Sequence, residues 1–178
     1  AGVLAAALSE PASDRLKAMR VLEREQWLPI SLKEAWDFFG SPHNLSRITP
    51  EDMGFSIRGE VPDAPVFPGQ RITYSVRPLF GIPLTWVTCI AVAEAPHRFV
   101  DVQLRGPYKR WWHEHTFVPK DGGVLMKDRV EYELPLGPLG DLMHRWVVRE
   151  RLRRIFDHRR RALERIFRRS SGDNAHVA

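Results

Sequence analysis

Cysteine and long apolar segments are what this sequence has least of, and both shortages restrict what the protein can be. The one cysteine, Cys89, excludes an intramolecular disulfide and a cysteine-rich zinc site. No apolar run approaches the roughly 18–20 residues that a membrane-spanning helix needs. Extended disorder is excluded as well, because 43% of the 178 residues are hydrophobic and 10% are aromatic. A chain of this length and composition predicts one compact domain.

Residues 1–19 differ from the rest of the chain because they are small and weakly patterned. Val3–Leu8 is apolar, but no basic segment precedes it, and Ser9-Glu10-Pro11 follows where a cleavage site would be expected. This pattern favours a tail or short helix over a signal peptide, and it favours a cytoplasmic protein. We therefore expect a single domain over residues 20–169 and a C-terminal tail over residues 170–178.

Alternation of apolar and polar residues predicts a series of strands separated by turn residues. Because the connections between most of them are short, an antiparallel meander is expected. The seven strand candidates are Arg20–Leu28, Phe55–Glu60, Gln70–Arg77, Leu84–Glu94, His97–Leu104, Tyr108–Val118 and Val124–Leu134.

Two short helices are predicted between the first and second strands. Ser31 and Glu34 form a Ser-x-x-Glu capping box, and Gly40 ends the helix that follows. Ser41-Pro42 begins a second short helix that runs to about Ile48.

The longest predicted helix lies at the C-terminal end of the domain, since Leu142–Phe167 contains neither proline nor glycine. A helix from Asp141 to Arg168 would be about 42 Å long, whereas the radius of gyration of such a chain is roughly 16 Å. The helix must therefore lie across the sheet. The fold class is α+β: a curved seven-stranded antiparallel sheet wrapped around this helix. The helices cover only part of so broad a sheet, and the remainder is either filled by large side chains or left as a ligand pocket.

The last two strands place polar side chains on the buried face of the sheet. A four-residue turn at Pro119–Gly122 would pair Val118 with Gly123 and would set His113 opposite Asp128. Because alternate residues share a face, the buried face includes Trp111, His113, His115, Met126, Asp128 and Tyr132.

Three interpretations of this polar group remain open. It is a buried His113–Asp128 hydrogen bond that fixes the register, a cluster that orients a ligand at the floor of a cavity, or a metal site. His-x-His on a strand points two imidazoles the same way, as some zinc sites require, with Asp128 as a third ligand. We predict neither metal nor cofactor, because this spacing is weak evidence. No nearby serine or cysteine completes a hydrolase triad.

The C-terminal helix carries an arginine within its apolar stripe. Arg159 falls near the centre of the stripe, and a buried arginine is costly unless it is paired. Arg159 either extends past the sheet edge to solvent or meets an acidic group such as Asp128 or a ligand carboxylate. Met143 and Trp146 lie on an apolar surface rotated from that stripe, which fits a cavity wall or ordinary packing.

The order of elements resembles the START-like, helix-grip superfamily called SRPBCC. Gly106–Gly140 (GPYKRWWHEHTFVPKDGGVLMKDRVEYELPLGPLG) and Ser31–Pro50 (SLKEAWDFFGSPHNLSRITP) are similar to bacterial ligand-binding SRPBCC proteins with no assigned ligand. The resemblance covers Arg20–Phe167 and implies a deep hydrophobic cavity between sheet and helix. It implies no catalytic set, because the polyketide cyclases of the superfamily differ in their polar cavity residues.

The sequence thus predicts binding or carriage of a hydrophobic small molecule, such as a lipid, a polyketide or an isoprenoid-like compound. An enzyme of the cyclase or dehydratase type, using His113 and Asp128 for acid–base chemistry, is the alternative. We assign no catalytic residue. The candidate ligand-binding residues are Tyr74, Trp111, His113, His115, Met126, Asp128, Tyr132, Met143, Trp146 and Arg159.

The basic charge of the chain belongs to one helix. The chain carries a net charge of +5, but residues 141–169 alone carry +7, and the remainder is therefore slightly acidic. Sequence-specific nucleic-acid binding is not expected, because no aromatic platform accompanies the arginines. Weak contact with an anionic membrane or RNA is a second alternative, and nothing indicates the oligomeric state. The arginines of this solvated face are Arg153, Arg154, Arg160 and Arg161.

Overall fold

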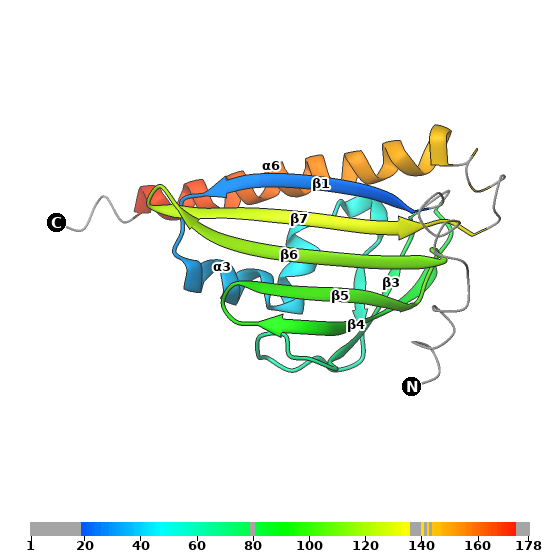
Figure 1. Ribbon diagram of the computed structural model, residues 1–178, viewed down its shortest axis with the longest axis horizontal. Coiled ribbons are helices and arrows are strands. Elements are labelled where there is room, and N and C mark those ends of the chain that lie inside the picture. The colour runs from blue at the N-terminus through cyan, green and yellow to red at the C-terminus, as the bar shows by residue number, and fades with distance from the viewer. Residues whose placement is uncertain (1–18, 79–80, 136–139, 141, 143, 174–178) are drawn as a thin grey trace.

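A curved antiparallel sheet packs against one long helix, as Figure 1 shows. The computed structural model describes residues 19–78, 81–135, 140, 142 and 144–173. The sheet order is β1-β7-β6-β5-β4-β3-β2, so the first strand pairs with the last and the others form a meander. This confirms the predicted fold class. The strands are β1 (Arg20–Leu28), β2 (Ser56–Arg58), β3 (Arg71–Val76), β4 (Leu84–Glu94), β5 (Arg98–Arg105), β6 (Arg110–Lys120) and β7 (Gly123–Glu133).

The hairpin between β6 and β7 turns more tightly than predicted. Asp121 and Gly122 have φ values of 51° and 75°, and Lys120 pairs with Gly123. The expected four-residue turn is wrong, because Asp-Gly favours a two-residue turn whose twist matches the strands. The register moves by two residues, which keeps every side chain on its predicted face. It brings His115, rather than His113, directly opposite Asp128.

The helices between β1 and β2 begin as the capping signal predicts. In α3 (Leu32–Phe39), the backbone N–H of Glu34 donates to Ser31 Oγ at 3.2 Å, and the Ser31 N–H donates to Glu34 Oε2 at 2.7 Å. The buried face of α3 contributes alanine and three aromatic residues to the core. Three shorter turns follow, namely η1 (Pro42–Asn44), α4 (Leu45–Ile48) and η2 (Glu51–Met53).

The C-terminal helix is interrupted near its start. A π-helical turn, η3 (His144–Val148), precedes α6 (Arg149–Asp173). The prediction of one regular helix from Asp141 to Arg168 is therefore wrong at its beginning. At the other end, α6 continues to Asp173, five residues past the predicted end of the helix at Arg168. None of the described helices is both long and apolar enough to span a membrane.

The core divides into two clusters along the sheet. The first joins α3 to the later half of α6 and includes Trp36, Phe39, Phe117, Leu163 and Phe167. The second joins the beginning of α6 to the other end of the sheet and includes Trp86, Trp111, Val148, Leu152 and Phe156. Of the two cavities described below, the small one is lined by residues of both clusters, and the large one is lined by residues of the second cluster.

The N-terminal tail or short helix predicted over residues 1–19 lies almost wholly outside the described part of the chain. Met143 and the last five residues also lie outside it.

A candidate ligand cavity with a buried polar cluster

A large apolar cavity lies between the sheet and the first half of α6. Its volume is about 410 Å³, within the range of roughly 300–1,000 Å³ typical of small-molecule sites. Leu152, Ile155 and Phe156 of α6 form one wall. Ile82 also lines the cavity and is 58% exposed, which marks an opening to solvent. The sheet and the connecting segments supply Met53, Phe55, Tyr74, Val76, Leu84, Trp86, Tyr108 and Trp111.

Aromatic rings in contact with one another form the sheet wall of the cavity. The ring centroids of Trp86 and Trp111 are 5.2 Å apart in an edge-to-face arrangement, and those of Tyr74 and Trp86 are 5.7 Å apart. Such pairs stabilise one another beyond their simple burial. Burial raises the pKa of the Tyr74 phenol well above its ordinary value, with a further contribution from Asp101, so this hydroxyl stays neutral.

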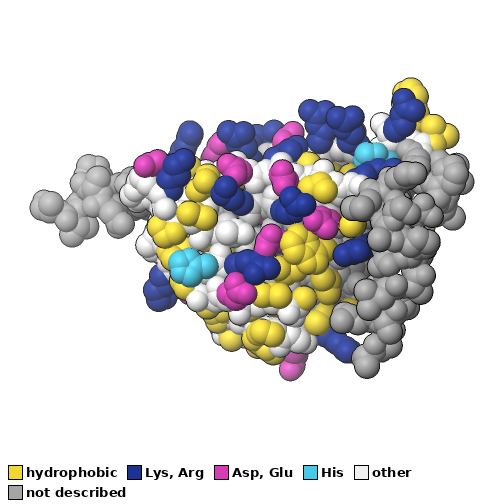
Figure 2. Space-filling view, in the orientation of Figure 1, with side chains coloured by type: hydrophobic (Ala, Val, Ile, Leu, Met, Phe, Trp, Pro, Cys, Tyr) yellow, Lys and Arg dark blue, Asp and Glu magenta, His cyan; other side chains and the backbone are white. Residues whose placement is uncertain are grey.

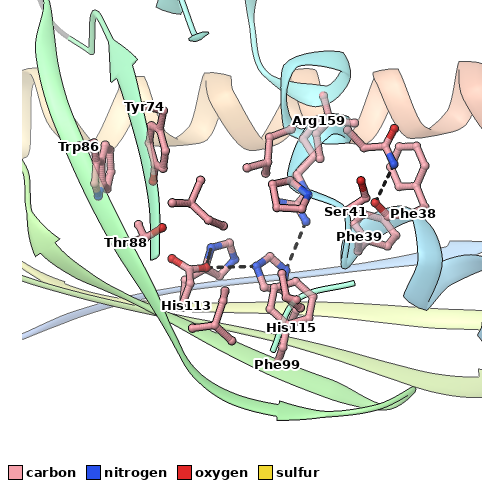
Figure 3. Close-up of a pocket in the computed structure, with 18 of the residues that line it drawn as sticks. Phe38, Phe39, Ser41, Tyr74, Trp86, Thr88, Phe99, His113, His115 and Arg159 are labelled. Carbon is pink, nitrogen blue, oxygen red and sulfur yellow. Dashed lines mark hydrogen bonds and ion pairs between the residues drawn. The ribbon is translucent and has the colours of Figure 1, made fainter. Parts of the chain in front are cut away.

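A small cavity of about 120 Å³ adjoins the large one. Its walls include Phe38 and Phe39 of α3 together with Thr88, Asp101 and His115 of the sheet. Figure 3 shows His113, His115 and Arg159 between Tyr74 and Trp86 on one side and Phe38 and Phe39 on the other. The residues common to both cavities are Leu45, Tyr74, Trp86, Trp111, His113 and Arg159.

Asp128 is the centre of the buried polar cluster. Its Oδ1 lies 3.0 Å from His113 Nε2, 2.9 Å from His115 Nδ1 and 3.3 Å from Arg159 Nη2. The residue is 2% exposed. Burial alone would raise the pKa of the carboxyl, but the Arg159 charge and the hydrogen bonds from both histidines hold it well below its usual range. Asp128 is therefore ionised.

Arg159 is paired with Asp128 inside the protein, which is the second of the two environments predicted for it. It is only 9% exposed, and its Nη2 lies 3.3 Å from both Asp128 Oδ1 and His115 Nδ1. Its guanidinium also lies over the Phe39 and Phe156 rings, 5.4 and 6.0 Å from their centroids. The side chain does not reach solvent past the sheet edge, because an ionised partner is available inside.

Asp101 faces the two histidines from the side opposite Asp128. Its Oδ2 lies 3.5 Å from His113 Nδ1 and 3.5 Å from His115 Nε2. Burial and the neighbouring His115 lower the pKa of His113, which favours a neutral imidazole. Burial acts the same way on His115, but its interactions with Asp101 and Asp128 outweigh burial and raise its pKa.

Four of the described residues predicted to bind the ligand line neither cavity. Asp128 lies behind His113 and His115. Met126 is buried in the first core cluster. The Tyr132 hydroxyl is 2.8 Å from His144 Nε2, beside β1 and α6 rather than in either cavity. Both side chains are on the predicted face, but the sheet is longer than the cavities. Trp146 is 76% exposed, because it belongs to the π-helical turn, whose i→i+5 pattern changes the direction of side chains relative to a regular helix.

The sequence reasoning missed Asp101 and most of the apolar wall. Asp101 lies two residues after the buried Phe99 on β5. Because alternate residues of a strand share a face, this spacing could have placed Asp101 on the buried face. Three buried donors have no hydrogen-bond partner among the described residues, and two of them, Trp86 Nε1 and Arg159 Nε, belong to residues that line both cavities.

The predicted basic face lies along α6, away from the cavities. Figure 2 shows lysine and arginine side chains gathered along the edge of the molecule where α6 runs. Arg153, Arg154, Arg160 and Arg161 are all exposed, and Arg160 Nε is 3.4 Å from Glu164 Oε1.

Comparisons with known proteins identify the fold. No protein-family profile matches the sequence, and a search of curated proteins finds no match. A START superfamily protein from Mycobacterium smegmatis superposes with a TM-score of 0.62 at 14% identity, over 84% of this chain and 97% of that one. Ara h 8.0201 gives a TM-score of 0.53 at 17% identity, over 82% and 97% of the two chains.

A two-domain protein is also similar. The di-domain ARO/CYC StfQ from the steffimycin biosynthetic pathway gives a TM-score of 0.67 at 15% identity, over 90% of this chain and 55% of StfQ. The chain therefore spans about half the length of StfQ. These similarities and the seven strands around one long helix show that the chain has the START-like, helix-grip fold of the SRPBCC superfamily.

Proposed function

We propose that the protein binds or carries a hydrophobic small molecule in the large cavity. The observation that carries this proposal is an apolar cavity of about 410 Å³ that ends at a buried, charged cluster. A molecule that entered it would bury its apolar body against Trp86, Trp111 and Leu152. Burial of apolar surface contributes about 25 cal/mol per Å², which makes such a cavity a favourable place for a lipid, polyketide or isoprenoid-like compound.

The polar end of the cavity restricts the ligand further. His113 and Arg159 line both cavities, and the Trp86 and Arg159 donors lack partners among the described residues. Buried donors usually find an acceptor. We therefore infer a ligand with at least one oxygen at the end that faces β6. The similarity of the fold to an ARO/CYC from a polyketide pathway supports a polyketide as one such ligand.

A cyclase or dehydratase is the second candidate, and it rests on His113. This side chain lines the cavity, its pKa is lowered, and Asp128 holds its Nε2 at 3.0 Å. A neutral, oriented imidazole is suited to accept a proton from a bound substrate. Membrane or RNA contact through the α6 arginines and a cytoplasmic location stay predictions from the sequence.

Binding of a fluorescent fatty acid, measured by titration, tests the first proposal. Ile155→Trp places a large ring into the cavity from a half-buried position on α6, and we expect the dissociation constant to rise at least about tenfold, since tenfold is only about 1.4 kcal/mol. Trp146→Ala is the matched control, because Trp146 is exposed. Absence of saturable binding to the native chain, or equal affinity in the two variants, would contradict the proposal.

Mass spectrometry of the native protein separates a carrier from an enzyme. The compound that copurifies is incubated with the native protein and with His113→Ala. An enzyme that removes water lowers the mass of this compound, and one that only closes a ring changes its chromatographic retention at constant mass; His113→Ala prevents either change while the compound remains bound. A carrier leaves the mass and the retention unchanged in both samples.

A further inference from the structure

Two imidazole nitrogens and one carboxylate oxygen converge at the small cavity. His113 Nδ1 and His115 Nε2 each lie 3.5 Å from Asp101 Oδ2. One ligand atom from each of these three residues lies within 4.8 Å of the others. All three residues line the small cavity, and His113 also lines the large one.

These separations suit a shared cation better than direct hydrogen bonds. Hydrogen bonds between nitrogen and oxygen normally span about 2.7–3.2 Å, and both contacts with Asp101 are longer. In a tetrahedral site with bonds of about 2.0–2.1 Å, neighbouring ligand atoms are ~3.3 Å apart. Both nitrogen–oxygen separations of 3.5 Å lie close to that value, whereas the separation of the two imidazole nitrogens is known only to be within 4.8 Å and would need to shorten around an ion.

Asp128 orients both imidazoles from behind. It contacts the other ring nitrogen of each histidine, at 3.0 Å for His113 Nε2 and 2.9 Å for His115 Nδ1. If these nitrogens carry the protons, Arg159 Nη2 donates to Asp128 Oδ1 rather than to His115 Nδ1, and the nitrogens that face Asp101 have free lone pairs. A carboxylate that holds the far side of a histidine is the usual partner of a metal-binding imidazole. Arg159 fixes Asp128 in turn, at 3.3 Å.

We propose that Asp101, His113 and His115 bind a divalent transition metal such as Zn²⁺ or Fe²⁺. Two imidazoles and one carboxylate are a donor set used by both ions when a coordination position is kept open. The third protein ligand is Asp101, and Asp128 is a positioning residue. The open position faces the cavities, where the oxygen of a bound molecule coordinates the ion.

The charges of the cluster agree with this assignment. A metal ion binds imidazoles in their neutral form, and the two carboxylates and Arg159 then leave one net negative charge beside an aromatic wall. A divalent ion converts this to one positive charge. The site then favours an anionic oxygen ligand, such as a carboxylate, an enolate or hydroxide.

The test measures metal affinity of the tag-free chain after removal of metal by a chelator. Zn²⁺ is titrated in competition with a chromophoric chelator, and Co²⁺ is added separately to read its visible absorption bands. We expect one equivalent of metal, and bands that report nitrogen and oxygen donors. Asp101→Asn and His115→Ala should lower the affinity by more than the roughly 10–100-fold typical of losing a positioning partner.

His97→Ala is the matched control, because His97 is an exposed histidine of the same sheet region. It should bind metal as the native chain does. The proposal is overturned if the native chain binds no stoichiometric metal, or if Asp101→Asn and His97→Ala have the same affinity. Circular dichroism reports whether each variant is folded. The Co²⁺ spectrum of the native chain tests the site even where a variant fails to fold.

The metal proposal and the ligand-binding proposal fail separately. Fatty-acid binding without stoichiometric metal overturns only the metal site. Stoichiometric metal without saturable fatty-acid binding overturns only the hydrophobic ligand.

Discussion

Asp128→Asn tests whether the buried cluster is an ion-pair network that the fold depends on. The substitution keeps the size of the side chain and removes its charge. Arg159, 9% exposed, then loses the carboxylate at 3.3 Å. Removing one partner of a buried ion pair costs about 3–5 kcal/mol, because the remaining charge is left without compensation.

This loss is large for a domain of this size. Total stability is commonly about 5–15 kcal/mol, and 1 kcal/mol shifts the melting temperature of a chain of this length by roughly 2–4 °C. We therefore expect the metal-free Asp128→Asn variant to melt roughly 6–20 °C below the native chain. Differential scanning calorimetry and urea unfolding measure the difference. Asp63→Asn, at an exposed position, is the control and should change stability by less than about 0.5 kcal/mol.

The pH dependence gives the sign of the effect. The pKa of Asp128 is lower in the folded chain than in the unfolded chain, so its stabilisation is present above the ordinary pKa of 3.8 and is lost as the pH falls through the folded value. Asp128 also raises the pKa of His115, so the difference in unfolding free energy between the native chain and Asp128→Asn should increase as the pH falls through the histidine range. It should shrink only in acid, below about pH 4.

A double-mutant cycle identifies the partner. Arg159→Met removes the other charge, and the combined variant leaves neither group unpaired. We expect a coupling energy of about 1–3 kcal/mol between the two sites. Additive losses, or a loss from Asp128→Asn no larger than that of Asp63→Asn, would refute the reasoning.

Two further substitutions test the local structure. Ser31→Ala removes the side-chain cap of α3, where Ser31 Oγ accepts from the Glu34 N–H at 3.2 Å. It should lower the free energy of unfolding, measured in urea, by about 1 kcal/mol. Ser46→Ala should cost less, because Ser46 is exposed on α4 and its hydroxyl donates only to the nearby His43 carbonyl. Gly123→Ala should destabilise the chain more than Gly122→Ala, although only Gly122 has a positive φ. An added Cβ at Gly123 would lie 2.4 Å from the Leu28 carbonyl oxygen, whereas nothing lies within 4 Å of one at Gly122; equal melting temperatures would contradict the close approach of β1 to β7.

The fold was largely predictable because its signals are local. Alternation placed β1 and β4 at their observed bounds, and the Ser31–Glu34 spacing located α3. The contact between His113 and Asp128 was predicted from the wrong register. It is present because a shift of two residues keeps both side chains on one face, where Asp128 reaches both histidines.

The cavity walls were less predictable because they depend on curvature and helix geometry. Met126 and His113 share a face of the sheet, but only His113 reaches the cavities. Trp146 lies in an apolar pattern, yet the π-helical turn leaves it exposed. Alternation along β5 indicates only which face of the sheet Asp101 occupies. Its contact with the histidines depends on β5 lying next to β6, where Asp101 pairs with His113.

The pairing of the first strand with the last also has a consequence for folding. All nine residues of β1 pair with β7, from Arg20 with Tyr132 to Leu28 with Val124. The chain between Leu28 and Val124 is about 95 residues long, and closing such a loop costs ~4 kcal/mol of chain entropy. Such long-range pairing also slows folding relative to local hairpins. During synthesis, β1 emerges long before its partner does. Its apolar side chains therefore stay uncovered until nearly the whole sheet has been made, and the edge of β7 is open until β1 joins it.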